Sequence, residues 1–208
     1  MHNFMTLKNV KTSLKEITKS LSTNHNKREN LIKNTREVVI LCSQSIIAVH
    51  KGELNSAKIK AQIASKIIAK ERKIAKGDLR KLLVIAEQEL VEALSYLAIV
   101  QKKEIPSAKS LGVSDESYIL GLLDCIGELK RQVYDDIRVG KSREAARIFE
   151  IMENLYLYLY PFATYDKLIK ETRRKLDVNR VLVEGVRAAL TEEVRRANLI
   201  DVLNKFNK

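Results

Sequence analysis

The sequence of this protein is poor in the residues that form turns and strand-rich folds. Its 208 residues include only 7 glycines, 2 prolines and no tryptophan, and aromatic side chains make up 5%. Hairpins and β-sandwiches need many more turn-forming residues than this. Hydrophobic residues nevertheless account for 45% of the chain, which is enough for one continuous core. We therefore expect an all-α fold, formed by a single domain over residues 1–208.

Cysteines and long apolar runs are also scarce. Cys42 and Cys125 both fall in apolar stretches and do not form a CxxC motif. Two isolated thiols are typical of a reducing compartment, so we expect core positions for both and a cytoplasmic location. The most apolar stretch, residues 38–49, is interrupted by Gln44 and is shorter than the roughly 18 apolar residues of a membrane span. With no signal-peptide features either, we expect no membrane association.

Lysine and arginine outnumber the acidic residues by 38 to 26, which gives a formal net charge of +12. Such an excess suits a polyanionic partner such as nucleic acid, although a basic surface without that role is the alternative. Two runs of basic residues are the candidates for contact with a phosphate backbone. From these runs we select Lys73, Lys76, Arg80, Lys81, Arg173 and Arg174. The alternative for each of them is an ordinary solvated helix face.

Apolar residues that recur every three or four positions predict seven helices. The expected ranges are 4–21, 27–50, 54–73, 79–102, 115–138, 142–160 and 165–206. Polar residues 22–26 separate the first two, Asp78 is expected to cap the fourth, Ser114 the fifth, and Pro161 ends the sixth. Short connections between long helices indicate mostly antiparallel neighbours in one bundle.

Two pairs of carboxylates stand at helical same-face spacing: Glu89 with Glu92, and Asp124 with Glu128. The first pair lies in residues 82–94, which are apolar on nearly every side of a helix, and an unpaired carboxylate is costly there. If the two helices face each other, four acids converge with no lysine or histidine between them. A hard cation that prefers oxygen ligands, Mg²⁺ or Mn²⁺, would relieve the repulsion.

Each pair also has a structural interpretation. For Glu89 and Glu92 the alternative is a solvated or ion-paired position on a helix that faces a partner, for instance against Lys or Arg of another segment. Against this alternative, the apolar residues Leu82 and Ile85 beside them indicate core positions. The second pair shares its predicted face with Arg131 and Asp135, as on an ordinary exposed surface, and Arg131 is spaced to pair with Glu128. The spacing alone leaves both interpretations open.

Gly121 and Gly127 lie inside the predicted helix that carries the second pair. Glycine there costs about 1 kcal/mol relative to alanine and often marks a close approach. We therefore expect another group to pack or bind near this face.

Other chemistries lack their motifs. His2, His25 and His50 are scattered, with no ExxH or HExxH, so a di-iron bundle and a zinc hydrolase are not indicated. The sequence also has no GxxxxGK[ST], GxGxxG or GxSxG. Few aromatics are available for base stacking, and those at 156–160 favour core or subunit contacts.

The segments around both acid pairs resemble the translin and translin-associated factor X family. These segments are ELVEA at residues 89–93, YILG at 118–121 and DCIGEL at 124–129. Residues 147–161 and 167–199 are similar to the family's carboxy-terminal helices, so the resemblance covers nearly the whole chain and is firmest from residue 79 onward. It departs at Ser117, where the family often has an acidic residue.

The resemblance implies a function and an assembly. The factor X branch is a metal-dependent endoribonuclease, whereas translin binds nucleic acid without the complete acidic set. By this resemblance Glu89, Glu92, Asp124 and Glu128 would be the catalytic residues that bind Mg²⁺ or Mn²⁺, with single-stranded RNA as substrate and single-stranded DNA as a further ligand. The family also implies a closed, hollow homo-oligomer, commonly an octamer. A compact chain without a nuclear-targeting extension suits an archaeal-type homologue.

Two other functions stay open at this point. One is a translin-like assembly that binds nucleic acid without cutting it, in which the acids are structural. The other is a helical scaffold that binds protein only, which would show no salt-dependent RNA affinity. Metal dependence separates the first of these from the nuclease.

Overall fold

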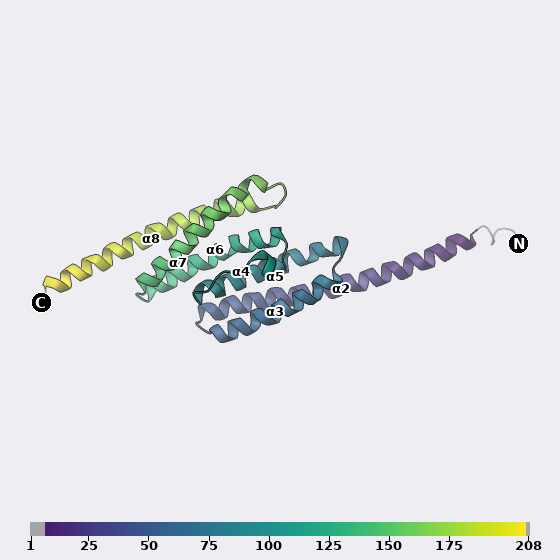
Figure 1. Ribbon diagram of the computed structural model, residues 1–208, viewed down its shortest axis with the longest axis horizontal. Helices are drawn as coiled ribbons and strands as arrows, with labels where there is room; N and C mark the ends of the chain where they lie inside the picture. Colours follow the sequence, from purple (N-terminus) through teal and green to yellow (C-terminus); the bar gives the residue numbers. More distant parts are fainter. Residues whose placement is uncertain (1–6, 207–208) are drawn as a thin grey trace.

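The computed structural model describes residues 7–206 of the chain, and these form helices and no strand (Figure 1). The α-helices are α2 (Lys8–His50), α3 (Leu54–Ile74), α4 (Val84–Val100), α5 (Ala108–Leu111), α6 (Asp115–Arg138), α7 (Ser142–Leu159) and α8 (Thr172–Phe206). Two 3-10 helices, η1 (Gly77–Leu83) and η2 (Tyr160–Tyr165), lie before α4 and after α7. The expected all-α fold is confirmed.

The helices form layers around α4 and α6. α2 and α3 pack together on one side of α4, and α7 and α8 cover α6 on the other (Figure 1). The packed helices share a core whose largest fully buried side chains include Tyr96, Leu123 and Ile126. Cys42 and Cys125 are unbonded and buried in this core, as expected, and burial raises the pKa of both thiols. Among residues 7–206, no helix has both the length and the apolar character needed to cross a bilayer.

Helix α2 is continuous over 43 residues, so the expected break at residues 22–26 is wrong. The polar segment contains no glycine or proline, and its side chains do not prevent helical hydrogen bonding. The hydroxyl of Thr23 donates back to the carbonyl of Lys19 at 2.9 Å, which satisfies the polar group inside the helix. The amino-terminal part of α2 extends beyond the other helices at one end of the molecule (Figure 1).

Two of the expected helix starts are displaced. The α4 helix begins at Val84, after η1, so Asp78 lies six residues before its start and cannot cap it. The Asp78 carboxylate instead pairs with Lys81 at 3.0 Å. The last helix begins at Thr172 and not at residue 165, since Glu171 adopts a positive φ that interrupts helical geometry. By contrast, the Ser114 hydroxyl accepts from the amide of Ser117 at 3.2 Å, so the expected cap of α6 is confirmed.

Gly121 is where α4 and α6 come closest. A β-carbon at this position would lie 2.5 Å from the carbonyl oxygen of Gln88 and 2.7 Å from Cβ of Val91. No other residue fits without moving one helix away from the other. At Gly127, two turns further along α6, a β-carbon would have no neighbour within 4 Å. The expected close approach is therefore found at Gly121 and not at Gly127.

This difference predicts opposite effects for one substitution at the two glycines. Gly121→Ala should lower the free energy of unfolding by about 1–3 kcal/mol, because the added methyl group overpacks the contact with α4. Gly127→Ala should raise it by up to about 1 kcal/mol, because alanine favours the helix and meets no obstacle. Urea unfolding of both variants measures these changes. Equal stability of Gly121→Ala and the unsubstituted protein would contradict the close contact.

Candidate active site

The four predicted carboxylates belong to two helices, α4 and α6, that pack against each other. Glu89 and Glu92 belong to α4, and Asp124 and Glu128 belong to α6. Gly121 lies three residues before Asp124 and touches α4 between Gln88 and Val91, so the close contact adjoins both pairs. The charges of Asp124 and Glu128 act on both Glu89 and Glu92, so the two pairs lie near each other. That these four acids form a metal site stays a prediction.

Glu92 is the most perturbed member of the cluster. Glu92 is 9% exposed, and the pKa of its carboxyl is raised to about 8. Burial is the largest cause; the charges of Asp124, Glu89 and Glu128 raise this pKa further, and Lys175 lowers it. Burial and then Asp124 also raise the pKa of Glu89. These shifts have the physical origin expected when carboxylates are desolvated close to one another. The site consequently favours either a proton or a cation at its centre.

Asp124 is the member that contacts a lysine. The side-chain amide of Gln88 donates to its carboxylate at 2.5 Å, and Lys175 of α8 forms an ion pair with the other carboxylate oxygen. Lys175 follows Asp124 by 51 residues. The expectation that no lysine lies among the acids is therefore wrong, because α8 packs on α6 and brings this ammonium to the edge of the cluster.

Glu128 contacts a histidine. Nε2 of His50, at the end of α2, donates to the Glu128 carboxylate at 2.5 Å, and Nδ1 of His50 lies 3.0 Å from the hydroxyl of Tyr96. The Tyr96 hydroxyl also lies within hydrogen-bond distance, 2.6 Å, of Oε1 of Gln132. Both His50 and Tyr96 are largely buried, so this row of polar groups fixes the position of Glu128.

The partner of Glu128 differs from the sequence prediction. Arg131 was spaced to pair with Glu128, but Arg131 is exposed and Glu128 pairs with His50. His50 was treated as an isolated histidine because 78 residues separate it from Glu128. No sequence motif links the two, and only the packing of both α2 and α6 against α4 reveals the contact.

A groove between α6 and α8 opens beside Asp124. It has a volume of about 250 Å³ and is lined by Leu123, Asp124, Gly127, Arg174, Lys175, Val178, Asn179 and Leu182. One wall of the groove is held in place by Asn179, whose side-chain amide donates to the carbonyl of Leu123 at 2.8 Å. The absent side chain at Gly127 contributes to the open space. The groove therefore combines a carboxylate of the acidic cluster with two cationic side chains.

The six basic candidates all lie on the surface. Lys73 lies in the last turn of α3, and Arg173 and Arg174 lie in the first turn of α8. The other three, Lys76, Arg80 and Lys81, lie in or next to η1. Arg174 is the one of the six that lines the groove beside Asp124, and it also pairs with Glu171 at 2.5 Å. Their exposure is compatible with contact to a phosphate backbone, and that role stays a prediction for all six.

The donor set suits a hard divalent cation. Four carboxylates offer only oxygen ligands, and their mutual desolvation is relieved by a positive ion. In the part of the chain that the structure describes, no three His, Cys, Asp or Glu side chains are arranged to hold an ion as they stand. Lys175 and His50 pair with Asp124 and Glu128 at the two edges of the cluster. Metal binding therefore requires these carboxylates to exchange partners.

Comparison with family models finds no match. An uncharacterised protein of Methanocaldococcus jannaschii is 33% identical over 181 residues, which are 86% of this chain and 81% of that protein. The crystal structure of apo-NeC3PO is similar with a TM-score of 0.77 over 86% of this chain and 96% of that chain, but at 21% identity it shows the fold alone.

Two structures of AfC3PO combine similar fold with higher identity. The crystal structure of AfC3PO is 31% identical, with a TM-score of 0.82 over 90% of this chain and 99% of that chain. AfC3PO in complex with duplex RNA is 30% identical, with a TM-score of 0.80 over 89% and 99%. C3PO is the complex of translin and translin-associated factor X. With this identity over nearly the entire length of AfC3PO, the chain belongs to the translin family.

Proposed function

We propose that this protein is a metal-dependent endoribonuclease of the factor X type, an archaeal-type homologue that cleaves single-stranded RNA. The observation that supports this best is the cluster of Glu89, Glu92, Asp124 and Glu128 across α4 and α6, with its centre buried and the pKa of Glu92 raised to about 8. Buried carboxylates without a structural partner are rare in stable cores and are typical of functional sites.

The four carboxylates would hold Mg²⁺ or Mn²⁺. When bound, such an ion supplies an activated water and stabilises the charge on a phosphate. Among the protein's own groups, His50 and Tyr96 keep Glu128 in place, and Gln88 does the same for Asp124. Lys175 and Arg174 offer positive charge to a phosphate oxygen at the edge of the groove. In this proposal the acids bind the metal ion, and the neighbouring cationic side chains bind the phosphate.

RNA is the substrate class that the relatives and the charge favour. AfC3PO, which is 30% identical to this chain, has a structure solved in complex with duplex RNA. The formal net charge of +12 on this chain suits the negative phosphate backbone of RNA. The preference for single strands, with single-stranded DNA as a further ligand, rests on the resemblance to the translin family. So does assembly into a hollow homo-oligomer, an octamer, with the acids on the inside. Two buried, unbonded thiols favour a cytoplasmic setting.

The main test is cleavage of a labelled single-stranded RNA with Mg²⁺ or Mn²⁺, with and without excess EDTA. Glu92→Gln and Asp124→Asn keep the side-chain shape but remove one charge, so we expect a loss of cleavage on the order of 100-fold for each, with RNA binding retained. Asp115→Asn, an exposed acid on α6, is the matched control and should cut normally. Undiminished cleavage in EDTA would contradict the metal dependence, and undiminished cleavage by either site variant would contradict the catalytic role of its acid.

The second candidate is a translin-like assembly that binds RNA without cutting it. The ion pair between Asp124 and Lys175 and the hydrogen bond between Glu128 and His50 favour this function, because they give two of the acids structural partners. In that case the unsubstituted protein binds RNA and leaves it intact with every metal. A protein-only scaffold would instead show no RNA affinity that falls with salt.

The buried carboxyl of Glu92 also predicts how the free energy of unfolding changes with pH. Between about pH 4.5 and 8 the unfolded chain has lost the Glu92 proton while the folded chain keeps it. The free energy of unfolding in EDTA should therefore fall as pH rises, by up to about 1.4 kcal/mol per pH unit from this group. Glu92→Gln lacks this titration, so we expect it to be more stable than the unsubstituted protein at pH 8 in EDTA.

Adding Mg²⁺ or Mn²⁺ reverses the order of the two proteins. A cation that binds the folded form stabilises it by about 2.7 kcal/mol at a concentration 100 times the dissociation constant. Thermal unfolding at pH 8 should show this increase for the unsubstituted protein and little of it for Glu92→Gln. An equal increase in both would remove Glu92 from the proposed ligands, whatever the outcome of the cleavage assay.

A further inference from the structure

The amino-terminal end of α2 carries an apolar stripe that no part of residues 7–206 covers. Five large apolar residues, 50–63% exposed, repeat at intervals of three and four positions on this segment. They are Leu7, Val10, Leu14, Ile17 and Leu21. This spacing is typical of a helix that packs along one side against another helix. We call residues 7–21 the arm.

The arm is helical although no other segment of its protomer, as far as the structure describes it, covers the stripe. All residues from 7 to 30 are exposed, and the buried side chains of α2 begin at Leu31. Isolated helices of this length are marginal in water, and their stability in proteins comes mostly from packing of an apolar face. An exposed stripe of this kind marks an interaction site. The arm therefore needs a partner outside its own protomer.

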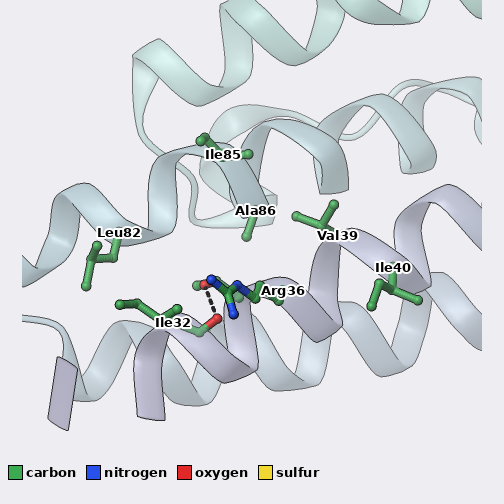
Figure 2. Close-up of a pocket in the computed structure, with 8 residues that line it drawn as sticks. Ile32, Arg36, Val39, Ile40, Leu82, Ile85 and Ala86 are labelled. Atoms are coloured by element: carbon green, nitrogen blue, oxygen red, sulfur yellow. Dashed lines mark hydrogen bonds between the residues drawn. The ribbon is translucent and has the colours of Figure 1, made fainter. Parts of the chain in front are cut away.

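A matching surface lies further along the same helix. Figure 2 shows this groove, with Ile32, Arg36, Val39 and Ile40 of α2 on one wall and Leu82, Ile85 and Ala86 on the other. Thr35 completes its lining, and its volume is about 380 Å³. We call it the α2–α4 groove. Leu82 and Ile85 were expected to belong to the core, but Ile85 is 66% exposed and Leu82 is half-buried at the rim.

The arm and the groove have the same spacing along α2. Leu14 and Leu21 are seven residues apart, as are Ile32 and Val39. Two α2 helices that run antiparallel, related by a twofold axis between residues 26 and 27, place Leu21 opposite Ile32 and Leu14 opposite Val39. Ile40 and Ile47, both exposed, extend the apolar surface toward the position opposite Leu7.

We propose that the arm of one copy of this chain lies in the α2–α4 groove of a second copy, and that the contact is made twice about this axis. The polar segment at residues 22–28 then lies where the two helices cross. Its lack of large apolar side chains separates the arm from the groove and sets the register between them. This interface stands independently of the proposed nuclease activity.

The size of the contact suits a stable dimer. The arm is about 21 Å long at 1.5 Å per residue, and half of the surface of a helix about 10 Å across is about 330 Å² over that length. Each copy contributes one arm and one groove, so each partner buries about 660 Å², and the total of about 1,300 Å² lies within the roughly 1,200–2,000 Å² of a stable interface. The arm's lysines, Lys8, Lys11, Lys15 and Lys19, lie beside the stripe, and no cluster of opposite charge is required for the apolar contact.

Molar mass measured by light scattering after size exclusion tests the proposal on the full chain. Leu14→Glu places a charge on the arm and Ile85→Glu places one in the groove, and both residues are exposed in the protomer, so the fold should survive. We expect each variant to lose at least half of the assembled mass. Val181→Glu, an equally exposed position on α8, is the control and should keep the mass. Unchanged mass in both test variants would overturn the proposal.

Mixing the two variants separates this interface from others. A mixed pair still has one intact arm and one intact groove that fit together, so the mixture should recover assembly that neither variant shows alone. If two arms formed a coiled coil instead, Leu14→Glu would disrupt the contact and Ile85→Glu would leave it intact. Mixing would then add nothing to the assembly that Ile85→Glu shows alone. Assembly of Ile85→Glu alone at the full mass would therefore refute the use of the groove.

Cysteine pairing provides a second measurement that does not depend on disrupting the interface. Leu21→Cys and Ile32→Cys in one chain are about 16 Å apart along α2, too far to join within a protomer. Oxidation of this double variant should give a covalent dimer, whereas each single variant should stay unlinked. The native thiols Cys42 and Cys125 are buried and do not compete. A covalent dimer from Leu21→Cys alone would instead indicate contact between two arms and would overturn the proposed register.

Discussion

The contact at Gly121 is the constraint on which the acidic cluster depends. The absence of a side chain there lets the backbone of α6 touch Gln88 and Val91 of α4, where a β-carbon would lie within 3 Å of both. Glu89 and Glu92 flank this point on one helix, and Asp124 follows it by three residues on the other. Any larger residue would move the helices apart and weaken the coupling between the two acid pairs. The glycine costs helix stability, and the proximity of the acids is the result.

The surroundings of the cluster divide the acids into a central and a peripheral group. Glu92 lies among apolar side chains at the centre, where only a proton or a cation can compensate for its desolvation. Asp124 and Glu128 are more exposed; Lys175 forms an ion pair with Asp124, and His50 donates a hydrogen bond to Glu128. A second buried acid, Glu87, differs from Glu92 because it has a cationic partner. Arg72 donates to the Glu87 carboxylate at 2.6 Å and also to the carbonyl of Leu111, so this pair joins α3, α4 and the segment before α6. Glu87 has a fixed structural partner, whereas no side chain within residues 7–206 pairs with Glu92.

Local patterns predicted most of the fold, and long-range packing explains the rest. Same-face spacing identified the four acids, and Ser114 and Gly121 were predicted because a cap and a close contact require particular residue types. Lys175 and His50 were missed as partners, since 51 and 78 residues separate them from Asp124 and Glu128. The polar residues at 22–26 were expected to break the helix, but the segment has no glycine or proline and the helix continues. We attribute the stability of this part of α2 to the proposed second copy, which the pattern of a single sequence does not reveal.

The continuity of α2 links the proposed assembly to the acidic cluster. At 1.5 Å per residue its 43 residues span about 64 Å, with the arm at one end and His50 at the other. The α2–α4 groove lies between them, and its second wall includes Ala86, three residues before Glu89. An arm that fills this groove packs against the first turn of α4 and restricts its movement relative to α2. Glu89 and Glu92 lie further along α4, and His50 holds Glu128 from the same α2 helix. Docking of a second copy would therefore stabilise the two helices that position three of the four acids.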